Sequence, residues 1–88
     1  MSEIAMIDSP AQTGRQAGRA AGERYLMHAK QGTMKDVRAL LPEKVALAKC
    51  WAEVLLSSDD ESERNSAEYN LAMYAELERY FVKANEKQ

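Results

Sequence analysis

The stretch from Pro42 to Leu56 limits the possible folds of this chain more than any other part of it. At about 100° per residue, the repeat of an α-helix, its apolar side chains form two adjoining stripes. Together they cover roughly 200° of the helix surface, whereas a helix packed on one side needs roughly 100°. We therefore expect a helix that is covered from two sides. One stripe holds Leu41, Val45, Ala48, Ala52 and Leu55, and the other holds Leu40, Leu47, Trp51 and Val54.

The chain length sets the scale of the fold. With 88 residues, the chain is long enough for one domain that buries about 60 to 65% of its unfolded surface. A chain this short seldom encloses a substrate pocket of about 300 Å³ or more. We expect a single helical domain over residues 16–88 that takes no small-molecule substrate.

Start and stop signals divide this domain into helices. Gly32 is a suitable residue to end a helix, and Thr33 with Asp36, or Ser58 with Glu61, has the spacing of a helix N-terminal cap. Pro42 fits the first position of a new helix, with a kink in one longer helix as the alternative. The sequence predicts an all-α fold, a small bundle of three main helices at about 16–31, 42–57 and 61–84, with a short extra helix at about 34–41 and a flexible N-terminal tail over residues 1–15.

Gly14, Gly18 and Gly22 recur every four residues near the start of the first helix. In a helix they form a ridge without side chains, which lets another backbone approach closely. The membrane use of this repeat requires an apolar host of about twenty residues, and Arg15 and Arg19 exclude one here. Each Gly costs about 1 kcal/mol relative to Ala inside a helix, so this segment needs a packing partner.

The residues that carry catalysis are scarce. His28 is the only histidine and Cys50 the only cysteine, so an internal disulfide and a Cys/His zinc site are excluded. We expect a partly buried His28, and Cys50 on the wetter side of its helix. The acidic run 57–63 lacks the central glycine of a calcium loop. The sequence predicts no enzyme, no cofactor and no metal.

Two further absences concern location. No apolar run reaches the roughly 18 to 20 residues of a membrane span, and the N-terminus lacks the basic and then apolar order of a signal peptide. We expect a cytoplasmic protein with no membrane contact.

The apolar surface of the helices favours a binding role. On the C-terminal helix, Tyr69, Met73 and Tyr80 flank the main apolar face, and together with Trp51 they are residue types that anchor protein interfaces. Three short helices are too small to cover all of them. We expect a protein–protein interaction module, such as an inhibitor, adaptor or regulatory subunit, that forms a homodimer or another homo-oligomer.

The charge distribution supports one alternative. Residues 1–50 carry a net charge of +3 and residues 51–88 a net charge of −5. Arg15, Arg19 and Arg24 are candidate phosphate contacts. A nucleic-acid-binding regulator would use the basic N-terminal half, which also holds Lys30, Lys35 and Arg38. The acidic sequence pI of about 5.4 argues against it.

Overall fold

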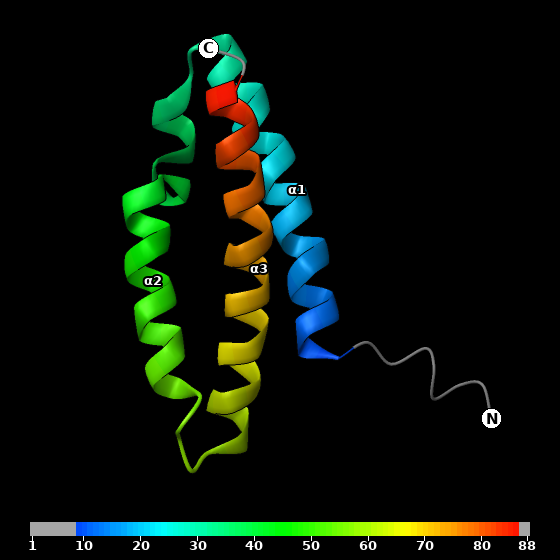
Figure 1. The fold of residues 1–88 in the computed structure, drawn as a ribbon, viewed down its shortest axis with the longest axis vertical. Helices are drawn as coiled ribbons and strands as arrows, with labels where there is room; N and C mark the ends of the chain where they lie inside the picture. Colours follow the sequence, from blue (N-terminus) through cyan, green and yellow to red (C-terminus); the bar gives the residue numbers. More distant parts are fainter. Residues whose placement is uncertain (1–8, 87–88) are drawn as a thin grey trace, which may run out of the picture.

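The chain folds into three α-helices and one short 3₁₀-helix (Figure 1). A computed structural model describes residues 9–86, with side chains up to residue 85, and contains no β-strand within that range. The predicted all-α bundle is confirmed. Its elements are α1 (Pro10–Gln31), η2 (Met34–Leu40), α2 (Pro42–Leu55) and α3 (Glu61–Glu86).

Helix α1 begins at Pro10, six residues before the predicted start. The Ser9 side chain accepts a hydrogen bond from the backbone N–H of Gln12 at 3.2 Å, and the Ser9 N–H donates to the Gln12 side chain at 3.0 Å. This reciprocal cap, followed by proline at the first helical position, fixes the start of the helix. Residues 10–15 are therefore helical rather than part of the predicted tail, and residues 1–8 of that tail lie outside the described residues.

Two of the predicted boundaries lie where the sequence placed them. Gly32 adopts the left-handed conformation, with φ 76° and ψ 20°, and its N–H donates to the carbonyl of His28. Leu41 is extended, with ψ 146°, and Pro42 is the first residue of α2. Pro42 therefore starts a new helix and does not kink a longer one.

The two predicted capping patterns are replaced by other contacts. Thr33 makes no side-chain cap bond, and the segment after it is a 3₁₀-helix with an irregular residue at Val37. The Ser58 hydroxyl accepts from the Asp60 N–H at 3.0 Å, and the Asp60 carboxylate accepts from the Ser62 N–H at 2.9 Å. Asp60 thus caps α3 in place of Ser58.

Helix α3 lies between α1 and α2 in a flat layer of 45 × 32 × 20 Å (Figure 1). Across the described residues, no Cα atom of α1 lies within 8 Å of one of α2, because each helix packs on its own side of α3. The helix that is covered from two sides is therefore α3, not α2. The core lies where η2 joins the layer, and its buried residues are Ala21, Tyr25, Val37, Val45, Leu77 and Phe81.

The glycine ridge of α1 makes the close contact that its spacing predicted. A Cβ atom on Gly14 or Gly18 would collide with the main-chain oxygen of Tyr69 or Met73, and one on Gly22 would collide with the ring of Tyr80. Glycine is therefore needed for space at these positions, and the two backbones touch without intervening side chains. None of the helices within residues 9–86 combines the length and apolarity needed to cross a bilayer.

Candidate protein-interaction surface

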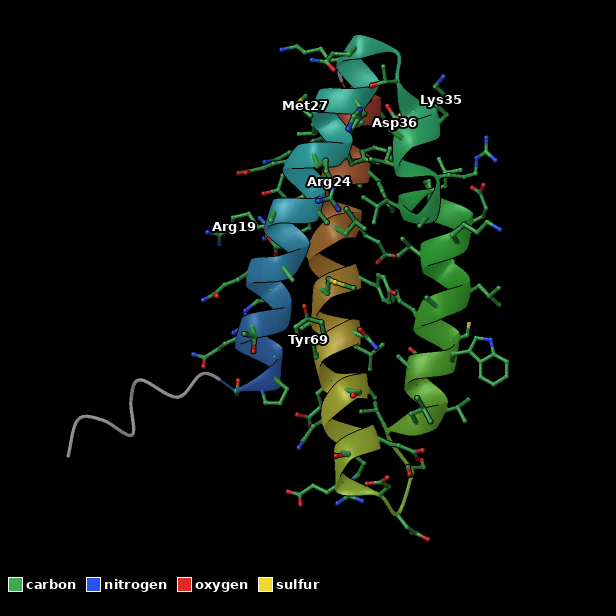
Figure 2. All side chains as sticks on the ribbon, turned by 180° about the vertical axis from the view of Figure 1, so that it is seen from behind. Arg19, Arg24, Met27, Lys35, Asp36 and Tyr69 are labelled. Carbon is green, nitrogen blue, oxygen red and sulfur yellow. The ribbon has the colours of Figure 1, made fainter. Side chains whose placement is uncertain are left out.

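Helix α1 covers the flank of α3 formed by Tyr69, Met73 and Tyr80. The carbonyl groups of Tyr69 and Met73 lie against the glycine ridge, and Figure 2 shows Tyr69 on α3 where α1 passes beside it. The Tyr80 side chain packs on Gly22 and is only 8% exposed. The sequence predicted that these three residues anchor a contact with another protein. In the structure, this flank contacts α1 of the same chain.

Helix α2 also differs from the prediction, because it is covered on one side only. Val45 and Ala52 are buried, whereas Leu47 is 60%, Trp51 66% and Val54 64% exposed. The first apolar stripe packs against α3. In the second stripe Leu40 packs against the core, whereas Leu47, Trp51 and Val54 have no cover within the described part of the chain. The predicted two-sided packing of α2 is therefore wrong, and Trp51 is not brought together with the three residues on α3.

We define the outer face of α2 as Leu47, Cys50, Trp51 and Val54, all of them exposed. Their spacing of three and four residues places them along one stripe of the helix. The cation nearest in sequence, Lys49, turns away from this stripe, and its Nζ lies 2.8 Å from Glu78 Oε1 on α3. The outer face is thus a continuous apolar surface without a charged side chain.

Exposed apolar residues elsewhere do not extend this surface into a larger patch. Met27 lies on α1 and Val82 on α3, and each is about half exposed. Leu56 directly follows α2 and is 40% exposed, but by the helical repeat it lies about 140° around the axis from Trp51. Single exposed apolar side chains are common on protein surfaces. The outer face of α2 differs because three large apolar residues are exposed on adjacent turns of one helix.

The two residues with catalytic potential lie on different helices. His28 Nδ1 is hydrogen-bonded to the Thr33 hydroxyl and lies 4.0 Å from Asp36 Oδ2, and its side chain is 17% exposed. Cys50 is exposed on α2. His28 lies near the end of α1 and Cys50 in the middle of α2, and within residues 9–86 no Cα atom of one helix lies within 8 Å of one of the other, so these two residues do not form a nucleophile and base pair. No group of three His, Cys, Asp or Glu side chains able to hold a metal ion occurs among the described residues.

The basic residues of the N-terminal half are exposed but scattered. Arg15 and Arg19 lie one turn apart on α1, whereas Arg24 lies about 140° around the helix from Arg19 by the helical repeat. Figure 2 shows Arg19 and Arg24 on different sides of α1, and Lys35 on η2. The remaining two cations are Lys30, which by the helical repeat lies about 20° around α1 from Arg19, and Arg38 on η2. The structure does not gather the six into one patch.

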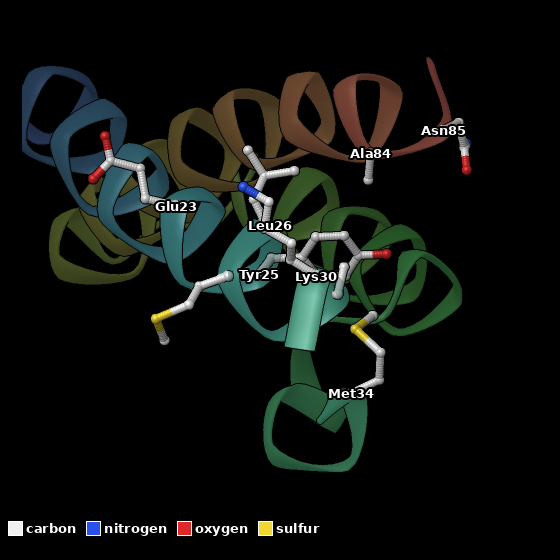
Figure 3. A pocket seen from close by; sticks show the side chains of 9 residues that line it. Glu23, Tyr25, Leu26, Lys30, Met34, Ala84 and Asn85 are labelled. Carbon is white, nitrogen blue, oxygen red and sulfur yellow. The ribbon is translucent and has the colours of Figure 1, made fainter. Parts of the chain in front are cut away.

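A depression of about 740 Å³ lies at the end of the layer where α1 ends (Figure 3). It is open to solvent, so it is not the enclosed pocket that the chain length argued against. Its charged residues are Glu23 and Lys30, and its lining contains neither His28 nor Cys50. The other lining residues are Tyr25, Leu26, Met27, Ala29, Met34, Ala84 and Asn85.

Comparison with known proteins identified no similar protein. No protein-family model matches the chain, and neither the curated proteins nor the solved structures gave a significant match.

Proposed function

We propose that this chain is a small, non-enzymatic protein–protein interaction module of the inhibitor, adaptor or regulatory-subunit kind, and that it self-associates through the outer face of α2. The observation that carries the proposal is the exposure of Leu47, Trp51 and Val54, each at 60% or more, on one side of one helix. Burying a side chain of this kind contributes about 1.5 to 3 kcal/mol when it is fully exposed beforehand. Three such residues supply a favourable free energy of association.

The residue types of the outer face support an interface. Trp is enriched at the energetic centres of protein interfaces because it buries a large area with few rotatable bonds. Charged residues are depleted at such centres, and the outer face has none. The surface around it is charged, with Glu43 and Lys44 toward the start of α2 and Glu53 near its end. An apolar centre with a charged rim is the usual composition of an interface.

The proposal of a non-enzymatic role rests on the side chains of the structure. His28 is held by Thr33 near the end of α1, and Cys50 belongs to the outer face of α2. The depression between α1 and α3 holds no nucleophile with an adjacent base among its lining residues. We also propose a cytoplasmic location, since a reducing compartment keeps an exposed thiol such as Cys50 free.

A nucleic-acid-binding regulator is the alternative proposal, and it has less support. Affinity for a nucleic acid increases with the number of cationic side chains that contact the phosphates of its backbone. Arg15, Arg19 and Arg24 occupy more than one side of α1, so a straight duplex meets only some of them.

Sedimentation velocity over a concentration series tests the proposed interface. We expect the wild-type chain to shift from monomer to dimer as its concentration rises. The double variant Leu47→Gln/Val54→Gln should remain monomeric, because it places two polar side chains on the outer face. Gln is a good helix former, so the far-ultraviolet circular dichroism should not change.

The matched control is Met27→Gln/Val82→Gln, which makes the same kind of change at exposed apolar residues outside the outer face. We expect this variant to dimerise like the wild type. A wild-type chain that stays monomeric at the highest attainable concentration contradicts self-association. Unchanged dimerisation of the Leu47→Gln/Val54→Gln variant shows that another surface forms the interface.

A further inference from the structure

The charge distribution along α2 and its flanking segments indicates how two copies meet. We propose that two copies of this chain pair through the outer face of α2 with their α2 helices antiparallel. This inference rests on the proposed function, and it adds the orientation and register of the self-association.

The position of α2 leaves room for a second copy. In Figure 1, α2 lies at one edge of the layer and α1 at the other, with α3 between them. Within the described residues, α2 contacts only α3 and η2. A second chain that approaches the outer face of α2 therefore meets neither α1 nor the glycine ridge.

The outer face is suited to a twofold axis. In a twofold dimer the same surface lies on both sides of the contact. Leu47 and Val54 are seven residues apart, or about two helical turns, and the midpoint between them falls at Cys50 and Trp51. Antiparallel pairing about this midpoint places Leu47 of one copy opposite Val54 of the other, with Trp51 beside the axis.

Charges at the two ends of α2 distinguish antiparallel from parallel pairing. Residues 33–45 hold three cationic and two anionic side chains, a net charge of +1, whereas residues 53–64 hold five anionic and one cationic, a net charge of −4. Antiparallel pairing places the positive end of each copy beside the negative end of the other. Parallel pairing places the two negative ends together, where charges within about 10 Å repel each other at moderate salt.

The size of the outer face determines the strength of the pairing. Helix α2 has 14 residues, or a length of about 21 Å. A contact along this length is smaller than the roughly 800 Å² per partner of a standard stable interface. We therefore expect a weak, reversible dimer.

Crosslinking between engineered cysteines measures the orientation. Glu43 and Ser57 are exposed at opposite ends of α2, and antiparallel pairing about Cys50 and Trp51 brings them together. Two full-length variants are made in a Cys50→Ser background, one with Glu43→Cys and one with Ser57→Cys, and one of them carries a mass tag. Each is treated with a short bismaleimide crosslinker, alone and as an equimolar mixture.

Antiparallel pairing predicts that the crosslinked product forms between the two variants and not within either one. Within one variant the engineered thiols would be about 21 Å apart along the helix axis, which a short crosslinker does not span. Products within each single variant, and none between the two, would show parallel pairing and overturn the inference. In that case sedimentation still shows a dimer, and the proposed function survives. A chain that neither crosslinks nor dimerises overturns both.

A charge exchange provides an independent measurement. Lys44→Glu adds an anion to the end that faces residues 53–64 of the partner. The dimer dissociation constant at low salt should therefore rise about two- to fivefold, the range expected for exposed ion pairs. Adding Asp59→Lys to the same chain reverses both charges, and antiparallel pairing predicts recovery of the wild-type affinity. No recovery in the doubly substituted chain contradicts the antiparallel arrangement.

Discussion

Gly18 of α1 lies directly against the main-chain carbonyl of Met73 on α3, and a Cβ atom added to Gly18 would also lie 2.8 Å from the Cβ atom of Glu76. This contact explains how a helix with three internal glycines is stable. Those glycines cost about 1 kcal/mol each relative to Ala, and they permit a backbone approach that side chains would prevent. Packing on α3 offsets that cost, so α1 depends on α3.

Substitution of Gly18 by Ala tests this dependence. Helix propensity alone predicts a gain of about 1 kcal/mol, but the added methyl group meets main chain, which cannot rotate away. We expect Gly18→Ala to lower the free energy of unfolding by about 2 kcal/mol, within the range for overpacking, as measured by urea denaturation. The control, Gln16→Ala on the exposed side of α1, should change it by less than about 0.5 kcal/mol. A more stable Gly18→Ala variant would show that α1 does not pack this closely.

Substitution of Gly32 tests the cost of its backbone conformation separately from steric crowding. A Cβ atom here would meet nothing within 4 Å, but φ is 76°. We expect Gly32→Ala to lower the free energy of unfolding by about 1 kcal/mol through the strain of the left-handed conformation. Gly32→Asn should cost less, because Asn tolerates this conformation better. Equal stability of the Ala variant and the wild type in thermal denaturation would contradict the assigned helix end.

Two leucines give a matched test of core and outer face. Leu77 on α3 is 0% exposed, whereas Leu47 on α2 is 60% exposed. Leu77→Ala should lower the free energy of unfolding by about 2 to 5 kcal/mol, because it leaves a cavity. Leu47→Ala should cost the monomer less than about 0.5 kcal/mol while weakening the dimer. Comparable losses from both variants in dilute solution would place Leu47 in the core.

The sequence predicted the helices well and their partners less well. Helix ends depend on local signals, so Gly32 and Pro42 located theirs correctly. The cap formed by Ser9 and Gln12 is also present in the sequence, but the region lacks an apolar period, and the pattern therefore predicts a tail. Asp60 replaced Ser58 as a cap because neighbouring Ser and Asp residues compete for the same role.

The sequence of a single helix does not show which other helix packs against it. A wide apolar arc shows that a helix has more apolar surface than one contact uses, but not whether a second contact exists within the chain. Helices α2 and α3 both have such an arc. The repeat of Gly14 and Gly18 predicted that α1 needs a close packing partner, but nothing within α1 identified α3 as that partner. For α2 no such partner segment exists in the described chain, and Leu47, Trp51 and Val54 of its second stripe are exposed.

Electrophoretic mobility shift at low salt tests the nucleic-acid alternative. Because Arg19 and Arg24 lie on different sides of α1 (Figure 2), we expect no retardation of short single-stranded or duplex oligonucleotides. Binding that weakens steeply as salt rises would show several phosphate contacts. That outcome would favour the nucleic-acid-binding regulator over the interaction module.

The most direct test of the outer face uses the fluorescence of Trp51, the only tryptophan in the chain. At high dilution its ring should be open to a water-soluble quencher, as its 66% exposure requires. As the protein concentration rises, we expect quenching to decrease and the emission to shift to shorter wavelength, because the ring enters an apolar contact. The Leu47→Gln/Val54→Gln variant should show neither change. Quenching that is the same at every concentration of the wild-type chain would contradict self-association through α2.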